Sequence, residues 1–282
     1  ILTAEYGNLR LWRNTAVAAL PPGGSIDFGA GTLGFEWDED LDNGSRPPGL
    51  IHLSTTARDV PIYLQDYGST YAAGFATHHL TMYKAPSGAR VFGAGTVQWA
   101  WGLDQNHDRW EVSGMSSGPP AQSSMQQATM NLFADMGNVQ PASPMPGMIP
   151  TPGTTDATPP TSAFTFPAAG GHVQSGATLT VTGTAVDAGG GAIGMVDVSV
   201  DGGLTWHHAT GRTTWTYDWA PGGVGSATIM CRATDDSGNM ETPGASLTVT
   251  VDPRVCPCTI WSPTTTPALI ETNTDPFELG VR

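Results

Sequence analysis

Polar side chains follow the apolar run 90–99 closely. Asp104 and His107 come just after it, with Asn106 and Asp108 as neighbours. If the run is a strand, these residues lie in the loop at its end, which is where α/β proteins place side chains that contact substrate. Asp104 and His107 are therefore the predicted catalytic residues.

An acidic turn is the second place where spacing points to chemistry. Asp38, Asp40 and Asp42 alternate along the chain, as carboxylates do in calcium-binding loops. Gly44 comes one residue later than such a loop requires, and Gly49 stands where a bidentate glutamate would close the site. Two interpretations stay open, a calcium site and a solvated acidic turn.

Two adjacent histidines, His78 and His79, lie in an expected strand. Neighbouring side chains of a strand point to opposite faces, so only one of the two can enter a given pocket. A histidine at a sheet edge or in the core is the alternative interpretation.

The composition excludes several classes of protein. Only 13% of the 282 residues are charged, and 25 acidic residues against 11 basic ones give a net charge of -14. Such a chain has no basic patch for a nucleic acid backbone. No apolar run reaches the roughly 20 residues that a membrane-spanning helix needs. We therefore expect no nucleic acid partner and no membrane span.

A proline-rich linker at 141–160 divides the chain. Seven prolines between residues 140 and 160 favour an extended, semi-rigid spacer. Before it, residues 1–140 predict strands at 9–13, 49–54, 79–84 and 90–99, the last two as a hairpin. A helix is predicted at 121–136, with Met125, Ala128, Leu132 and Met136 on one face. This part is predicted to be a partial α/β or α+β domain.

After the linker the pattern is all-β. Short alternating apolar runs are separated by turns rich in Gly, Asp and Asn, which is typical of a β-sandwich. We expect one over residues 161–252, with strands at 178–182, 193–200, 215–219, 227–233 and 245–251. The predicted fold class is thus mixed, a partial domain followed by an all-β sandwich.

The three cysteines do not form a zinc site. Cys256 and Cys258 are two residues apart, and no second Cys/His pair lies near them. Cys231 lies in an expected strand. It either bridges to one of the pair in an oxidising compartment or is a free or buried thiol.

Residues 160–252 resemble a bacterial immunoglobulin-like (Ig-like) module. The resemblance rests on Val198-Ser-Val-Asp-Gly-Gly-Leu-Thr-Trp206, Trp215-Thr-Tyr-Asp-Trp219 and Arg232-Ala-Thr-Asp-Asp-Ser-Gly-Asn239. Such modules are also similar to the dimerisation domain of sulfite-oxidase-type enzymes. The fold implies spacing or presentation, with the tryptophans and His207 and His208 as packing residues. Glycan contact through exposed tryptophans such as Trp206 or Trp261 is the alternative.

Residues 1–140 resemble the C-terminal region of the large, or beta, subunit of N,N-dimethylformamidase. Several motifs occur in one order: Leu11-Trp-Arg-Asn-Thr15, Leu33-Gly-Phe-Glu-Trp-Asp38, Asp42-Asn-Gly44, Arg46-Pro-Pro-Gly49, Val91-Phe-Gly-Ala-Gly-Thr-Val-Gln-Trp-Ala-Trp-Gly-Leu-Asp104 and Gln127-Ala-Thr-Met-Asn-Leu132. The match covers about half of the chain.

That resemblance implies a non-haem ferric iron site, held by two tyrosines and a glutamate, that activates water against an amide carbonyl. Glu36 is the only glutamate inside a matching motif and is the predicted metal ligand. A buried or turn-capping carboxylate is the alternative role for it. The tyrosine ligands are expected upstream of Ile1, and the alternatives within the chain are Tyr63, Tyr67 and Tyr71.

We expect the chain to be a fragment of a secreted bacterial multidomain protein, extracellular or at the cell surface, in which residues 253–282 begin a further extracellular β module. The parent protein would hydrolyse an amide-type C–N bond. The alternative is a non-enzymatic structural, adhesive or glycan-binding protein. Expected partners are the remainder of the parent polypeptide, copies of the chain itself, or a glycan.

Overall fold

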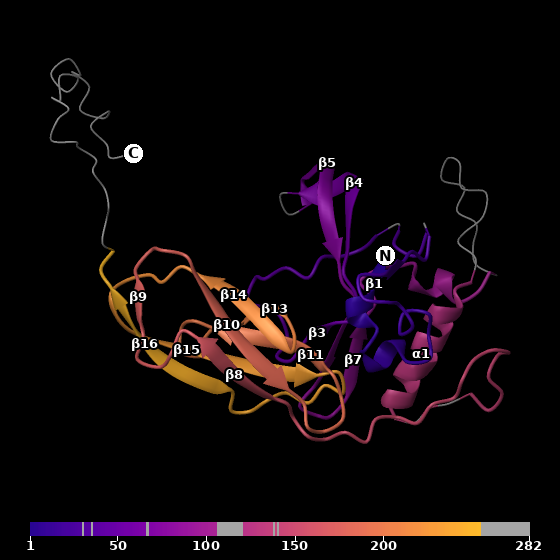
Figure 1. The fold of residues 1–282 in the computed structure, drawn as a ribbon. Coiled ribbons are helices and arrows are strands. Elements are labelled where there is room, and N and C mark those ends of the chain that lie inside the picture. Colours follow the sequence, from indigo (N-terminus) through magenta and orange to yellow (C-terminus); the bar gives the residue numbers. More distant parts are fainter. Residues whose placement is uncertain are drawn as a thin grey trace, which may run out of the picture.

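Two regions lie side by side in the computed structural model (Figure 1). The first spans residues 1–137, and the second is a β-sandwich over residues 161–252. The structure describes residues 1–29, 31–34, 36–65, 68–105, 121–137, 139 and 141–254. We expected residues 253–282 to begin a further module, and of these 255–282 lie outside that part of the chain.

The first region is antiparallel wherever its described strands pair. Strands β3, β6 and β7 form one sheet, β4 and β5 form a separate hairpin, and β1 pairs with β2. An α/β domain needs parallel strands, so the region is α+β and the α/β alternative is not supported. Its elements are β1 (Leu2–Thr3), the 3₁₀-helices η1 (Ala4–Tyr6) and η2 (Arg10–Trp12), β2 (Ser25–Ile26), β3 (Ile51–His52), β4 (Thr56–Gln65), β5 (Thr70–His78), β6 (Thr81–Lys84), β7 (Arg90–Gly93), the 3₁₀-helix η4 (Trp99–Gly102) and α1 (Ser123–Asp135).

Packing changes two of the expected strands. The predicted strand 9–13 instead contains the 3₁₀-helix η2, because Leu9 and Trp12 both enter the core, and the Trp12 N–H donates to the Leu9 carbonyl at 2.9 Å. Side chains three residues apart share a face of a 3₁₀-helix. The hairpin predicted at 79–84 and 90–99 is confirmed as β6 and β7, although β7 ends at Gly93.

Helix α1 packs against η2, with Met125, Ala128 and Leu132 buried as predicted. Its face also carries a fully buried Asn131, whose Nδ2 donates to two backbone carbonyls at 2.8 and 2.7 Å. Within the described residues, no helix is long and apolar enough to cross a membrane.

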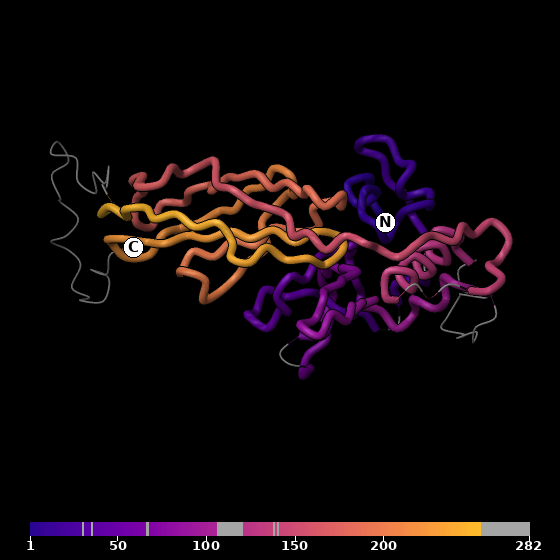
Figure 2. Tube along the Cα trace, turned by 90° about the horizontal axis from the view of Figure 1, so that it is seen from below, coloured from indigo at the N-terminus to yellow at the C-terminus, as the bar shows by residue number. Residues whose placement is uncertain are grey.

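The predicted linker, residues 141–160, lies along α1 before it enters the sandwich (Figure 2). Gln127 of α1 exchanges hydrogen bonds of 2.8 and 2.9 Å with the Ile149 backbone. The Thr154 N–H donates to Asp135 Oδ1 at 2.8 Å. We call this segment the strap, because these bonds hold it against the helix, whereas a semi-rigid spacer between domains was expected.

The sandwich consists of two sheets with the strand orders β13-β14-β10-β8 and β12-β11-β15-β16-β9. All five strands predicted here are present, and β9 pairs with β16 in parallel. The elements are β8 (Thr161–Phe166), β9 (His172–Gln174), β10 (Leu179–Val186), β11 (Ile193–Ser199), β12 (His207–His208), β13 (Thr210–Gly211), β14 (Thr214–Trp219), β15 (Gly225–Asp235) and β16 (Ala245–Asp252).

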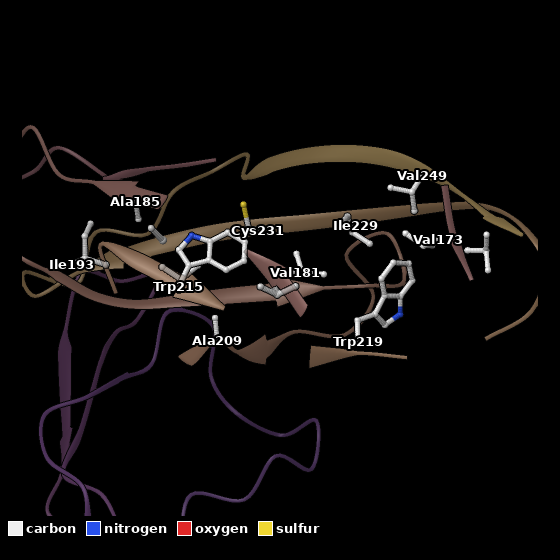
Figure 3. Close-up of a cluster of buried hydrophobic side chains, with 14 residues drawn as sticks. Val173, Val181, Ala185, Ile193, Ala209, Trp215, Trp219, Ile229, Cys231 and Val249 are labelled. Carbon is white, nitrogen blue, oxygen red and sulfur yellow. The ribbon is translucent and has the colours of Figure 1, made fainter. Parts of the chain in front are cut away.

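Two tryptophans fill the space between the sheets. Trp215 and Trp219 are buried among valines and Ile229 (Figure 3). Trp206 was expected beside them but is half-buried, with the Arg232 guanidinium 4.0 Å above its ring. Cys231 is a free, fully buried thiol that accepts a hydrogen bond from Ser162 Oγ at 3.2 Å. Cys256 and Cys258 lie outside the described residues.

The two regions share a core. Every residue of β11 is buried, because one face of the strand packs inside the sandwich and Met195 packs into the core of the first region. A Cβ at Gly194 would lie 2.8 Å from Ile51 Cγ2, so only glycine lets β11 approach β3 this closely. We call the contact between the sandwich and the first region the junction.

Candidate functional site

A cavity of about 760 Å³ opens in the first region. This volume lies within the usual range of ligand pockets, roughly 300–1,000 Å³. Three tryptophans line it, with polar side chains from β4, β5 and the segment before η4. Its lining includes Phe28, Trp37, His78, Gln98, Trp99 and Trp101.

Among the described residues, four buried polar side chains line the cavity: Ser54, Thr56, His78 and Gln98. His78 is 2% exposed, and its Nε2–H donates to the Ala94 carbonyl at 2.8 Å. This bond leaves Nδ1 as the basic nitrogen. Burial lowers the pKa of His78, against the raising effect of that hydrogen bond. A neutral imidazole therefore stands edge-on to the Trp37 ring, 5.9 Å away.

The Gln98 side chain lies close to the backbone of Gly34. A Cβ at Gly34 would lie 2.0 Å from Gln98 Oε1, so the motif that contains Gly34 needs its glycine to make room for the amide. The cavity thus combines tryptophan walls with a buried amide and a buried neutral imidazole, and Asp27, Arg58 and Asp59 also line it.

Glu36 and Asp104, the predicted site residues that the structure describes, do not line this cavity. Glu36 is exposed, and its carbonyl accepts the Val97 N–H at 3.1 Å, while the next residue, Trp37, lines the cavity. Asp104 is exposed and does not line the cavity either. His107 lies outside the described residues. The roles predicted for Glu36, Asp104 and His107 therefore stay predictions.

A second polar group lies at the junction, and we call it the junction cluster: Asp40, His52, His79 and His208. Asp40 Oδ2 accepts a 2.6 Å hydrogen bond from His52 Nε2. The His79 ring stacks on His52 with centroids 3.7 Å apart, and the His208 ring meets His52 edge-on at 4.8 Å. Three of these residues come from the first region, and His208 comes from β12 of the sandwich.

Burial dominates the acid–base behaviour of this cluster. It lowers the pKa of His52 to about 4, although the hydrogen bond to Asp40 acts in the opposite direction. For Asp40, burial alone would raise the pKa, but the hydrogen bond from His52 and the charge of Arg46 outweigh it and bring the pKa to about 2. At neutral pH a neutral imidazole therefore faces a charged carboxylate.

Aspartates of the acidic turn 38–44 form hydrogen bonds and ion pairs with basic side chains. Arg46 Nε contacts both oxygens of Asp40, at 3.1 and 2.9 Å, and Arg46 Nη1 reaches Asp42 at 3.4 Å. Asp42 also accepts a 2.7 Å bond from His207 Nδ1 of the sandwich. Calcium at this turn stays a prediction, for which these partners give no support.

Among the described His, Cys, Asp and Glu residues, Glu36 belongs to no group of three potential metal ligands. Hard oxygen ligands from tyrosine would have to surround a ferric ion there. The Tyr6 hydroxyl instead contacts Thr55, and the Tyr63 hydroxyl donates to Glu39 at 2.5 Å. Tyr67 lies outside the described residues. Iron at Glu36 therefore stays a prediction that rests on family resemblance.

The junction cluster could not be found from local sequence. His52 and His208 are far apart in the chain, and each stands in a short strand without a metal-binding spacing. His207 and His208 looked like packing residues of the sandwich. Only the docking of β12 beside the acidic turn brings these side chains together.

Comparison with known families agrees with both regions. Residues 3–110 match the family described as N,N-dimethylformamidase beta subunit-like, C-terminal. Residues 160–251 match the bacterial Ig domain. These matches confirm the two resemblances inferred from the motifs, and they fit a multidomain protein with an N,N-dimethylformamidase beta subunit-like part and a bacterial Ig domain.

Among curated proteins, the mitochondrial sulfite oxidases of Mus musculus and Homo sapiens are 40% and 39% identical to this chain over 93 residues. That match covers 28% of this chain and 17% of each sulfite oxidase. The chain thus spans about a sixth of the length of these curated relatives.

Two solved structures also align with part of the chain. A fibronectin(III)-like module of Clostridium thermocellum CbhA is 18% identical and covers 32% of this chain and 94% of its own, with a TM-score of 0.28. The PKD domain of an M14-like peptidase from a Thermoplasmatales archaeon is 16% identical and covers 34% and 98%, with the same TM-score. TM-scores this low do not establish a shared fold.

Proposed function

We propose that the cavity binds a small amide and that the parent protein hydrolyses its C–N bond. The observation that carries this proposal is the pair of buried polar side chains, His78 and Gln98, set among three tryptophans. The cavity lies in the region that matches the N,N-dimethylformamidase beta subunit-like family. Family resemblance thus supports the same chemistry.

The chemistry of the cavity suits an N-alkyl amide. The alkyl groups are apolar and would lie against Trp37, Trp99 and Trp101. An amide group is costly to bury without hydrogen bonds, and the Gln98 side chain offers both a donor and an acceptor. His78 adds a basic nitrogen at Nδ1.

In this proposal the Ig domain works as a rigid support outside the cell. The shared core and the strap fix it to the first region, so it holds the cavity at a set orientation to the rest of the parent protein. A bacterial Ig domain is compatible with an extracellular location. Recovery of the parent protein from the culture medium or cell surface, against the cytosolic fraction, would test this placement.

Tryptophan fluorescence offers a direct test of amide binding. Titration of the chain with N,N-dimethylformamide or N,N-dimethylacetamide at millimolar concentration should give a saturable change. Gln98→Met should weaken binding at least severalfold, because one buried hydrogen-bonding group contributes about 1 kcal/mol. The matched control is Gln174→Met on the exposed part of β9.

Release of dimethylamine by the parent protein, measured in parallel, would report the reaction itself. A linear response to amide with no saturation, or equal binding by the wild type and Gln98→Met, would contradict the proposed site.

The alternative function, assembly without catalysis, is favoured by the β4–β5 hairpin. The hairpin projects from the body of the molecule (Figure 1), and its apolar side chains are exposed, namely Ile62, Leu64, Tyr71 and Phe75. In the described part of the chain, β4 and β5 form a sheet of two strands only. Open strand edges can pair with a second copy.

Light scattering during gel filtration tests this alternative. If the hairpin joins two copies, the chain should elute as a dimer, and Leu64→Ser with Phe75→Ser should convert it to a monomer. Leu204→Ser is the matched control, since Leu204 is the most exposed of the large apolar side chains on the sandwich. A monomeric wild-type chain at micromolar concentration would count against this function.

A further inference from the structure

We propose that Asp40, His52 and His208 bind one divalent transition-metal ion, with zinc as the expected ion, at the junction. This site is separate from the amide cavity, because none of the three residues lines it. The proposal therefore stands or falls independently of the proposed function.

The ligand atoms are already gathered. One oxygen of Asp40 and one ring nitrogen from each histidine all lie within 4.8 Å of one another. His208 Nε2 is 3.9 Å from Asp40 Oδ2. In a tetrahedral site with bonds of about 2.0–2.1 Å, ligand atoms are about 3.3 Å apart. Small side-chain movements thus suffice to place an ion between them.

His208 is prepared to be a ligand. Its Nδ1–H donates to Asp197 Oδ1 at 2.7 Å, which leaves the lone pair on Nε2. That Nε2 is buried and has no hydrogen-bond partner. A buried acceptor without a partner is costly, and a cation is a partner that would satisfy it.

The bond between Asp197 and His208 is the arrangement that supports metal-binding histidines in proteins. A carboxylate behind the imidazole fixes the tautomer and the ring orientation and makes the free nitrogen a better ligand. Asp197 is in turn held by Arg232, whose Nε and Nη2 lie 3.2 and 3.1 Å from Asp197 Oδ2. The support is thus built on two adjacent strands, β11 and β15.

Asp40 and His52 need one change each. Asp40 Oδ2 exchanges its hydrogen bond with His52 for a bond to the ion, while Oδ1 keeps its contact with Arg46. His52 then carries its single proton on Nδ1, so that Nε2 can bind the ion. The charges around the site favour the binding of a cation, since three carboxylates, Asp40, Asp42 and Asp197, outnumber the two guanidinium groups of Arg46 and Arg232.

The ligand set points to the class of ion and to its effect. Two imidazoles and one carboxylate suit zinc and its first-row neighbours, whereas calcium and magnesium prefer oxygen ligands only. The side chains of Asp40, His52 and His208 are 12–14% exposed, so the ion would be largely enclosed. Since the ligands come from both regions, the ion would cross-link them.

Cobalt substitution tests the site. Tag-free chain, stripped with chelator, is titrated with Co²⁺ and then with Zn²⁺. We expect one equivalent of Co²⁺ to give visible absorption bands that Zn²⁺ removes, and Zn²⁺ to raise the thermal midpoint. Asp197→Asn should weaken binding about 10–100-fold, the usual effect of an outer-shell change, and His208→Ala should weaken it further.

His172→Ala is the matched control. His172 pairs with Asp252 on the exposed side of the sandwich, so its loss should leave metal affinity unchanged. Circular dichroism shows whether each variant is folded. A measurement on the wild-type chain does not depend on the folding of a variant. Zn²⁺ should protect His52 and His208, but not His172, from modification by diethylpyrocarbonate. Absence of binding at micromolar Zn²⁺, equal affinity in folded His208→Ala, or no selective protection would overturn the proposal.

Discussion

Arg10 donates its backbone N–H to the carboxylate of Asp236 at 2.7 Å, across the junction between the two regions. The same carboxylate accepts the Ala192 N–H at 3.2 Å, and Asp236 is 4% exposed. One buried side chain therefore satisfies backbone groups of both regions. This relationship, with the shared core, joins the two regions through buried contacts.

Asp236→Ala should lower the free energy of unfolding by about 1–3 kcal/mol, because it leaves buried N–H groups without an acceptor. Urea denaturation followed by tryptophan fluorescence measures the change. Asp218→Ala is the control: Asp218 is exposed and bonds only the Thr180 hydroxyl among the described contacts, so its effect should stay within about 0.5 kcal/mol. Equal effects of the two substitutions would contradict the role of Asp236.

Gly183→Ala should destabilise the sandwich. Its Cβ would lie 2.1 Å from the Trp215 ring and 2.4 Å from the Ala163 carbonyl oxygen, so the core would have to shift. Overpacking of this kind costs typically 1–3 kcal/mol. At Gly222 a Cβ would meet nothing within 4 Å, and Gly222→Ala should change stability by less than about 1 kcal/mol. The thermal midpoints of the two variants measure the difference. A Gly183→Ala variant as stable as the wild type would contradict the predicted overpacking.

Stability should fall as the pH rises from about 4 to about 6, through Asp235. Burial raises the pKa of Asp235 to about 6, and the charge of Asp156 adds to this against hydrogen bonds from Asn239 and Ser237. Asp156 and Asp187 face it, with carboxylate oxygens within 4.8 Å. The folded state therefore holds the proton more tightly than the unfolded state, whose pKa is near 3.9. The stabilising contribution of protonated Asp235 is therefore present at pH 4 and is lost as the pH rises through about 6.

The contribution of Asp235 is at most about 3 kcal/mol, at roughly 1.4 kcal/mol per pKa unit. Urea denaturation at pH 4 to 7 should show a smaller pH dependence for Asp235→Asn, which stays uncharged, than for the wild type. Asp252→Asn, at an exposed carboxylate, serves as the comparison. Parallel curves for the wild type and Asp235→Asn would exclude the effect.

The Cys231 thiol should be unreactive in the folded protein. Burial raises the pKa of Cys231 to about 12, and the charge of Glu241 adds to this against the hydrogen bond from Ser162. Only the thiolate is nucleophilic, so at pH 8 alkylation should slow about a thousandfold relative to the unfolded chain. Mass spectrometry of the Cys231 peptide after iodoacetamide treatment checks this. Rapid native labelling would show that β15 opens.

Strand periodicity predicted the sandwich well, because alternating residues such as Val196, Val198 and Ile229 report directly which face is buried. The first region was harder. Leu9 and Trp12 pack through a 3₁₀ turn, and β4 and β5 expose side chains on both faces, so neither shows the period of two that marks a half-buried strand. Apart from the predicted β6–β7 hairpin, its antiparallel pairing depends on contacts that no local pattern encodes.

The sites show the same limit. Asp40 was singled out for its spacing to Asp38 and Asp42, yet its partners in the fold are Arg46 and His52. The cavity was not predicted at all, because the tryptophans and Gln98 that line it also read as ordinary packing residues. In the junction cluster, which side chains meet is decided by how the two regions dock.

The position of β16 has a mechanical consequence. This strand is hydrogen-bonded to β9 in parallel on one side and to β15 on the other. Tension applied at Arg254 and directed along β16 would act across both rows of hydrogen bonds at once, so they would share the load in shear rather than open one after another like a zipper. The sandwich is thus suited to transmit pulling forces between the first region and whatever is attached beyond residue 254.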